Sequence, residues 1–242
     1  SQRRRVEEPY TPAEDVIRMT KSHHCQGLTG TYNEPTIEAE YLIDVMKMAK
    51  KEGLFTTWVS NGYLTLEAVE AIAPYLDAIT VDFKGSGNQE FYRKYAMVPS
   101  AQPIFEALKA LEERGVHVEV TDLIVPVPTG SSLEDVRKLA EWIRENLGDE
   151  TPFHLLRFHP DYKMLDVPGT PLEILREGWS AAKEVGLRYV YLGNLYDPKY
   201  ENTYCPSCGA LCIERRYLGL VQSYLKNRDQ CPKCGYRINV II

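Results

Sequence analysis

The sequence contains no long run of apolar residues. No stretch approaches the roughly 18 consecutive apolar residues that a membrane-spanning helix needs, and the opening residues SQRRRVEEPY lack the apolar core of a signal peptide. Basic residues are scattered apart from Arg3 to Arg5, which we interpret as a solvated terminus, and the formal net charge is −6. We therefore predict a cytoplasmic protein that binds neither a membrane nor nucleic acid.

Cysteine is almost absent from the first two hundred residues. Cys25 stands alone there, and we predict a small buried side chain for it. The remaining cysteines crowd the end of the chain, at Cys205, Cys208, Cys212, Cys231 and Cys234. Their CxxC spacing is typical of metal ligands rather than of disulfides.

Helical and strand-like segments alternate from Thr11 to about Asn194. Helices are predicted at residues 12–22, 36–51, 64–75, 101–114, 133–146 and 171–185, and strands at residues 27–32, 55–60, 78–83, 116–125, 153–158 and 188–193. This alternation predicts an α/β fold with parallel strands. Six strands, each followed by a crossover segment, favour a partial TIM-type (β/α) barrel over an open sheet. We predict one domain over residues 1–200 and a zinc ribbon over residues 201–242.

Polar side chains follow most of the predicted strands. They are Asn33 and Glu34, Ser60 and Asn61, Asp82 and Lys84, His159, and Asn194. The carboxyl ends of parallel strands meet on one face, so these residues are expected to surround one small molecule.

Each of these residues also has a structural explanation when it is taken alone. Asn61 and Gly62 form an ordinary turn, Asp82 can pair with Lys84, and an isolated histidine such as His159 is often structural. The turn before Pro35 needs only a cap, however, and Glu34 is more than capping requires. We therefore predict that Glu34 binds a ligand rather than caps a helix.

Five short motifs occur in an order typical of one enzyme family. They are TYNEPTI, VSNGYLT, VDFKG, LIVPVPTGSS and LLRFHPDYKM. With them, the chain resembles radical S-adenosylmethionine (SAM) enzymes of the pyruvate formate-lyase-activating type. More narrowly, it is similar to the radical SAM proteins called the AmmeMemoRadiSam system enzyme.

The resemblance implies a role in SAM binding for most strand-end residues. Asn33 and Glu34 would hold the methionyl amino group, and Ser60 and Asn61 would line the pocket beside it. Asp82 and Lys84, two apart on one strand, would meet ribose and carboxylate groups, and His159 would reach the ribose. The resemblance also implies a [4Fe–4S] cluster, a 5′-deoxyadenosyl radical and a protein substrate.

Two departures from the family pattern affect these expectations. The printed residues contain no CxxxCxxC loop to hold the cluster, so we expect this chain to be inactive alone. The parent is expected to carry that loop upstream of Ser1, and the rival is a natural cluster-free form. Val59 also stands where activating enzymes often place an Asp, so no cation is predicted there.

The two knuckles CPSCG and CPKCG predict a structural zinc site. Its ligands would be Cys205, Cys208, Cys231 and Cys234, with Gly209 or Gly235 closing each knuckle. Cys212 leaves open an auxiliary iron–sulfur cluster with Cys205 and Cys208. The two cores look separate in the sequence, so zinc removal is expected to unfold the tail alone.

Two rivals to the radical enzyme remain. One is a cluster-free SAM-binding or protein-interaction module that uses the zinc ribbon as its contact surface. The other is hydrolysis by Asp82 and His159, which ranks last because no nucleophile accompanies them. The sequence identifies neither the substrate nor the oligomeric state.

Overall fold

The computed structural model describes residues 10–217 and 219–241. The Arg3 to Arg5 run lies outside the described residues. The described residues form two compact units, one made of residues 10–82 and 102–118 and the other of residues 83–101, 119–217 and 219–241. We call them unit 1 and unit 2.

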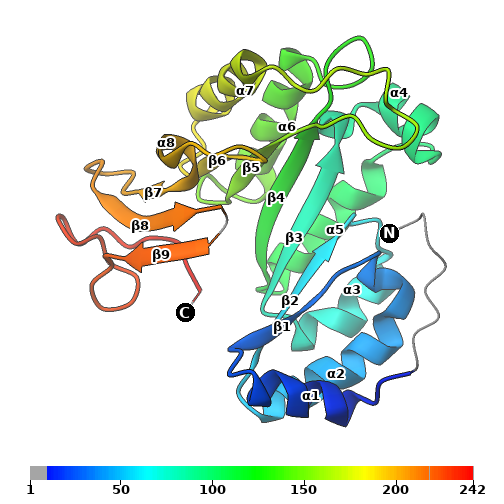
Figure 1. Ribbon diagram of the computed structural model, residues 1–242, viewed down its shortest axis with the longest axis vertical. Helices are drawn as coiled ribbons and strands as arrows, with labels where there is room; N and C mark the ends of the chain where they lie inside the picture. The colour runs from blue at the N-terminus through cyan, green and yellow to red at the C-terminus, as the bar shows by residue number, and fades with distance from the viewer. Residues whose placement is uncertain (1–9, 218, 242) are drawn as a thin grey trace. The chain divides into compact units, whose positions relative to one another are not determined.

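Unit 1 places its helices beside the first strands of the sheet (Figure 1). Its elements are α1 (Ala13–Ser22), β1 (Gly27–Gly30), α2 (Ala39–Lys51), β2 (Phe55–Ser60), α3 (Leu66–Ile72) and α5 (Gln102–Glu113). Ala13, Ile17, Val45 and Ala49 form a small core between α1 and α2. Helix α3 begins where the Thr65 hydroxyl accepts the Ala68 N–H at 3.2 Å.

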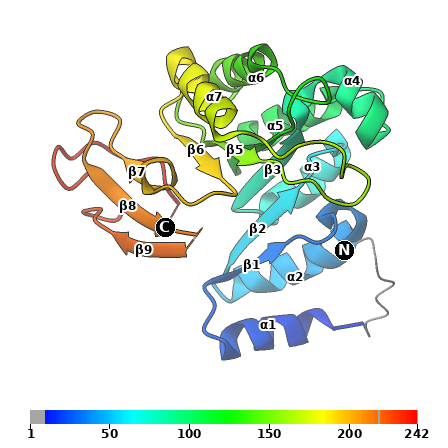
Figure 2. The same cartoon turned by 45° about the horizontal axis from the view of Figure 1, so that its top comes forward.

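Unit 2 packs two long helices against its strands, and α6 and α7 lie side by side in Figure 2. Its elements are α4 (Gln89–Phe91), α6 (Leu133–Asn146), β5 (Phe153–Arg157), α7 (Leu172–Val185), β6 (Val190–Gly193), α8 (Pro198–Glu201), β7 (Thr203–Tyr204), β8 (Leu211–Arg216) and β9 (Gly219–Ser223). Helix α6 begins with a capping box between Ser132 and Asp135. Helix α7 ends at Gly186, which takes φ 111°.

Six parallel strands form one sheet in the order β1-β2-β3-β4-β5-β6. Strands β3 (Ala78–Lys84) and β4 (His117–Ile124) run from one unit into the other. Burial alternates along both, so Val81 and Phe83 are buried while Asp82 and Lys84 share the half-buried face. The predicted parallel α/β sheet is confirmed, and the partial barrel stays a prediction.

The predicted helices and strands coincide closely with those of the structure. The helix predicted at 36–51 begins with a 3₁₀ turn, Pro35–Glu38, before α2. Three short helical segments were not predicted, namely the 3₁₀ turn Gly85–Gly87, α4 with the π-helical turn Tyr92–Ala96 that continues it, and α8. They are too short to show a 3.6-residue period, which explains the omission.

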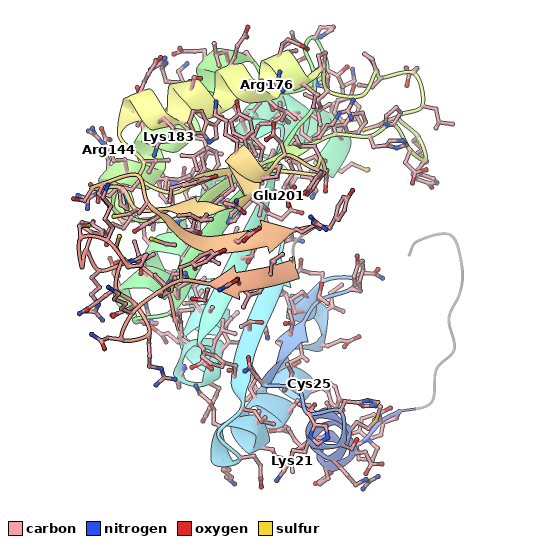
Figure 3. The ribbon with its side chains drawn as sticks, turned by 60° about the vertical axis from the view of Figure 1, so that its left-hand side comes forward. Lys21, Cys25, Arg144, Arg176, Lys183 and Glu201 are labelled. Atoms are coloured by element: carbon pink, nitrogen blue, oxygen red, sulfur yellow. The ribbon has the colours of Figure 1, made fainter. Side chains whose placement is uncertain are left out.

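The prediction of a buried Cys25 is wrong. Cys25 is exposed in the turn between α1 and β1 (Figure 3). Its neighbours His23, His24 and Gln26 are exposed as well. A turn residue has no helix or strand face to bury, so the average preference of cysteine for the interior does not apply.

No helix in the described part of the chain is long and apolar enough to cross a membrane.

Asp77 is a structural carboxylate whose replacement has a predictable effect. It accepts hydrogen bonds from the Lys50 ammonium and from the Thr56 N–H, the latter at 2.9 Å. Burial opposes its ionisation, but the Lys50 and Thr56 hydrogen bonds hold its pKa below the ordinary value. The stabilisation is therefore present above the unfolded-state pKa and disappears as the pH falls through the folded-state value.

We expect Asp77→Asn to lower the free energy of unfolding at neutral pH by about 1.5–3 kcal/mol. Urea unfolding at neutral pH and at pH ~3 measures this loss. The difference in unfolding free energy between the variant and the unmodified protein should be smaller in acid. Asp44→Asn is the control, since Asp44 is 72% exposed and pairs with Lys47 at 3.6 Å. An equal deficit at both pH values would contradict the electrostatic explanation.

Candidate functional site

The carboxylate of Glu34 is the centre of a hydrogen-bond network in unit 1. Oε1 accepts the Thr36 N–H at 3.2 Å, the Thr36 hydroxyl at 2.7 Å and the Ser60 hydroxyl at 2.7 Å. Oε2 accepts the Asn61 N–H at 2.8 Å. The bond from the Thr36 N–H caps the 3₁₀ turn, so the prediction that Glu34 does not cap is wrong. The network also joins the turn after β1 to the end of β2.

Ser60 and Asn61 hold the end of β2 in one conformation. The Ser60 hydroxyl is buried and accepts the Gly62 N–H at 3.0 Å in addition to donating to Glu34. The Asn61 side-chain oxygen accepts the Tyr63 N–H at 2.8 Å. A Cβ on Gly62, which has φ 71°, would lie 2.5 Å from Val81, so glycine is required there. The structure thus brings together three of the predicted residues, Glu34, Ser60 and Asn61.

Asp82 and Lys84 lie on the half-buried face of β3, in unit 1 and unit 2 respectively. Lys84 is followed by the turn Gly85–Gly87, in which Ser86 takes φ 53°. The Ser86 N–H and hydroxyl both donate to the buried carboxylate of Asp122, at 2.8 and 2.6 Å. This contact fixes the backbone that follows Lys84.

Sequence reasoning missed the Asp122–Ser86 pair. A signal was present, because Asp122 alternates with Val118, Val120 and Ile124 on one face of β4, and a carboxylate on a buried strand face requires partners. Its partner was harder to find, because Ser86 lies 36 residues away in the chain.

His159 is exposed just after β5 in unit 2. The Thr170 hydroxyl accepts the Phe158 N–H at 3.0 Å and fixes the backbone before it. Asn194, predicted at the end of β6, takes φ 58° and donates to the Arg157 carbonyl at 3.0 Å. A different histidine, His154, contacts Glu119 at 2.8 Å near the amino end of β5. The amino ends of parallel strands are usually structural.

Four cysteines of the tail lie close enough to bind one metal ion. The ligand atoms of Cys205, Cys208, Cys231 and Cys234 all lie within 4.8 Å of one another. The sulfur atoms of Cys205 and Cys234 are 3.6 Å apart, and so are those of Cys208 and Cys231. A tetrahedral site with Zn–S bonds of about 2.3 Å requires a sulfur separation near 3.8 Å. The donor set therefore fits a single tetrahedral ion.

Burial and hydrogen bonds shift the pKa values of these thiols in opposite directions. Burial raises the pKa of Cys205 to about 12. Burial also opposes ionisation of Cys231, but the N–H groups of Cys234 and Lys233 and the nearby thiols lower its pKa to about 6. Cys212 is fully buried, and burial raises its pKa to about 12. Cys212 lies outside the group of four, and its thiol donates to the Ala210 carbonyl at 3.5 Å.

The expectation of separate cores for tail and body is wrong. Tyr189 belongs to the same buried cluster as Cys205, Cys212 and Cys231. Glu150 accepts a hydrogen bond from the Tyr236 hydroxyl at 2.5 Å. The tail, which we call the ribbon (residues 201–241), therefore packs on the body of unit 2, and the domain division at residue 200 stays a prediction.

The sheet is parallel, and the hydrogen-bond network of Glu34 lies at the carboxyl ends of β1 and β2. These two features place the protein in the class of parallel α/β proteins that carry polar groups at the carboxyl ends of their strands. Residues 1–143 match the family model described as the Radical SAM superfamily. The match covers more than half of the 242 residues, and the chain belongs to the radical SAM superfamily.

Three relatives illustrate the similarity. The uncharacterized protein MJ0808 of Methanocaldococcus jannaschii is 39% identical over 233 residues, which are 95% of this chain and 67% of that protein. The pyruvate formate-lyase-activating enzyme of Clostridium pasteurianum is 30% identical over 151 residues, 58% of this chain and 62% of the enzyme. A domain of the Bacteroides vulgatus pyruvate-formate lyase-activating enzyme shares the fold, with 16% identity and a TM-score of 0.59 over 69% of this chain and 99% of that one.

Proposed function

We propose that the full-length protein is a radical SAM enzyme of the AmmeMemoRadiSam system type that activates a protein substrate. The network centred on Glu34, in a chain of this superfamily, is the observation that supports it. The superfamily uses SAM and a [4Fe–4S] cluster, which together supply a 5′-deoxyadenosyl radical. The chain spans only about 62% of the Clostridium enzyme, so the activity of the whole protein is part of this proposal.

The strand-end residues are assigned to different groups of SAM by their chemistry. We assign the carboxylate of Glu34 to the methionyl ammonium, because within the described residues its Oε2 atom accepts one hydrogen bond, from the Asn61 N–H. Lys84 is assigned to the carboxylate of SAM, and Asp82 and His159 to the ribose. Ser60 fixes Glu34, while Asn33 and Asn61 line the pocket beside it. The residue types match, one by one, the ammonium, the carboxylate and the diol that SAM carries.

The residues of this chain do not fit the cluster in the same way. Cys25 is the only cysteine before Cys205, and it is exposed in the turn before β1. The four tail cysteines are too close together for a [4Fe–4S] cluster, whose ligand sulfurs bind different iron atoms and lie farther apart. We therefore assign the four cysteines to structural Zn²⁺ and not to the cluster.

The protein substrate is inferred from relatives that are named for activating pyruvate formate-lyase. A second candidate function, a cluster-free SAM-binding or interaction module, is favoured by one observation. Every residue of β9 in the ribbon is exposed, which suits a contact surface.

Two measurements test the proposed function. Calorimetry should show SAM binding to the chain as it stands. The full-length parent, reconstituted with iron and sulfide without oxygen, should release 5′-deoxyadenosine after reduction. Binding without 5′-deoxyadenosine in a parent that contains no CxxxCxxC loop would support the interaction module instead. Absence of SAM binding in both proteins would contradict both candidates.

Elemental analysis tests the metal assignment independently. We expect one zinc ion per chain, and its loss when Cys208 is replaced by serine, because three thiolates hold a structural Zn²⁺ poorly. Cys212→Ser should retain the metal, since Cys212 is not a member of the group of four. Iron in place of zinc, or loss of metal in Cys212→Ser, would overturn the assignment.

A further inference from the structure

The hairpin of β8 and β9 carries an aromatic and basic cluster where it meets the loop after β6. The Tyr217 ring stacks on Tyr196 with centroids 4.8 Å apart. The Arg216 guanidinium lies 5.9 Å from the centroid of the Tyr196 ring. Tyr196 is 43% exposed and Tyr217 is 71% exposed. Arg216 is exposed too and has no carboxylate partner in the described part of the chain.

Strand β9 has an open edge. It is the last strand in the order β7-β8-β9, and its five residues are all exposed. Leu220 and Val221 are 67% and 55% exposed, and β9 contains no charged residue and no proline. Proteins usually protect such an edge with lysine, proline or a bulge. The one register irregularity of the hairpin lies in β9, where Val221 is the extra residue between the pairs Arg215–Leu220 and Glu214–Gln222. The pairs on both sides of this bulge are regular.

Buried polar side chains fix the hairpin on the body of unit 2. Glu201 is 7% exposed and accepts the N–H groups of Tyr217 and Asp197 at 3.0 and 3.1 Å. Asn202 accepts the Arg215 N–H at 2.8 Å, and Thr203 accepts an Arg215 guanidinium N–H at 2.7 Å. Figure 3 shows Glu201 beside the strands of the ribbon. The open edge is therefore preorganised, which reduces the entropy lost when a partner binds.

The charge of the hairpin region differs from that of the rest of the chain. Residues 201–242 contain six lysines and arginines against three acidic residues, whereas the whole chain has a net charge of −6. The four thiolates with their assigned Zn²⁺ contribute −2, so the segment keeps a net charge of +1. A basic segment on an acidic protein favours an acidic partner. On both sides of the bulge at Val221, the edge of β9 offers N–H and C=O groups, which match a peptide backbone rather than a row of phosphates. A second copy of the chain would bring the same positive charge and is disfavoured.

We propose that β9 binds an extended acidic segment of a partner protein as an added strand, with the cluster of Tyr196, Arg216 and Tyr217 contacting its side chains. Arg216 pairs with an acidic side chain of the segment, and the two tyrosines supply rigid contact area. The identification of this partner as the substrate of the radical reaction rests on the proposed function. The strand addition itself does not.

A labelled twelve-residue peptide of alternating valine and glutamate residues is the probe for this surface. Fluorescence anisotropy should show binding to the full chain, with a dissociation constant below about 1 mM. The same peptide with N-methyl groups on alternate residues should bind at least about tenfold more weakly, because one row of its donors is removed. Arg216→Glu should weaken binding of the peptide about tenfold or more, because it reverses the charge that faces the acidic peptide. Val221→Glu should have an effect of the same size, because it places a negative charge on β9 opposite the glutamates of the peptide.

Lys138→Glu is the matched control, because Lys138 is a 65% exposed cation on helix α6. Circular dichroism and metal content must be unchanged in each variant, and calorimetry with SAM is run in parallel. Unchanged SAM binding in Arg216→Glu separates this proposal from the proposed function. The proposal fails if the N-methylated peptide binds equally well. It also fails if a mixed-sequence oligonucleotide displaces the peptide, or if light scattering shows a dimer that Val221→Glu dissociates.

Discussion

Removal of the metal from the four-cysteine group is expected to unfold the ribbon and to lower the stability of unit 2 as well. The ribbon has about 40 residues, too few to bury a sufficient core by itself. Binding of a structural Zn²⁺ contributes about 10–16 kcal/mol in small zinc domains at neutral pH, and this free energy drives folding. Without the ion, the ribbon loses the bonds that join Cys205 and Cys231 to Cys208 and Cys234, and the packing around Tyr189 is left to hold it.

The effect extends to the body because the buried cluster is shared. Tyr189 belongs to one buried cluster with Cys205, Cys212 and Ile213, so unfolding of the ribbon is expected to expose it. The contacts of Arg188 and Glu150 with Tyr236 are lost at the same time. We expect a lower melting temperature of unit 2 in addition to proteolytic loss of the ribbon.

Hydrogen exchange after treatment with a chelator measures both effects. Amides of β8 should lose protection completely, and those of β6 should lose part of theirs. Amides of β1 and α2, in unit 1, serve as the internal reference. If β6 keeps its full protection while β8 unfolds, the shared cluster contributes little and the ribbon behaves as an independent domain.

Glu34→Gln is expected to weaken SAM binding by about ten- to a hundredfold. The substitution removes the charge opposite the methionyl ammonium, a contact of roughly 1.5–3 kcal/mol. It also places an NH₂ group where Glu34 accepts four hydrogen bonds, so at least one donor loses its acceptor. The free energy of unfolding should therefore fall as well, by about 1–3 kcal/mol.

Two variants separate binding from structure. Ser60→Ala removes one donor to Glu34 but leaves its charge, so stability should fall while SAM affinity changes less than in Glu34→Gln. Glu38→Gln removes an exposed carboxylate of the same 3₁₀ turn and should leave affinity unchanged. Calorimetry on the chain and on its full-length parent gives the affinities. If Glu34→Gln loses stability but keeps its affinity for SAM, Glu34 is a cap and a tether only.

The strands were predictable because each is a short apolar or β-branched run between turn residues. FTTWVS and AITVDF needed nothing beyond their own composition. Residues whose role is local, such as Ser132 at the start of α6, were equally accessible. Cys25 shows the limit of this reasoning, because average burial says nothing about a particular turn.

Long-range contacts could not be derived from the pattern. Glu34 was noticed as unusual, but its double role depends on Ser60 and Asn61, which lie 26 and 27 residues away. The packing of Tyr189 against the tail cysteines requires the position of the ribbon, and no periodicity encodes that. Chemistry that is concentrated in one motif, such as the CxxC knuckles, is read from spacing alone.

The hydrogen bonds to Glu34 have one more consequence. Because protein N–H and O–H groups already solvate the carboxylate, its negative charge does not depend on water to be stable. A cation that arrives beside Oε2 therefore meets an oriented charge and displaces few water molecules from it. When a carboxylate exchanges water for a ligand, the dipoles around it normally have to reorient. Around Glu34 these dipoles were already oriented when the chain folded.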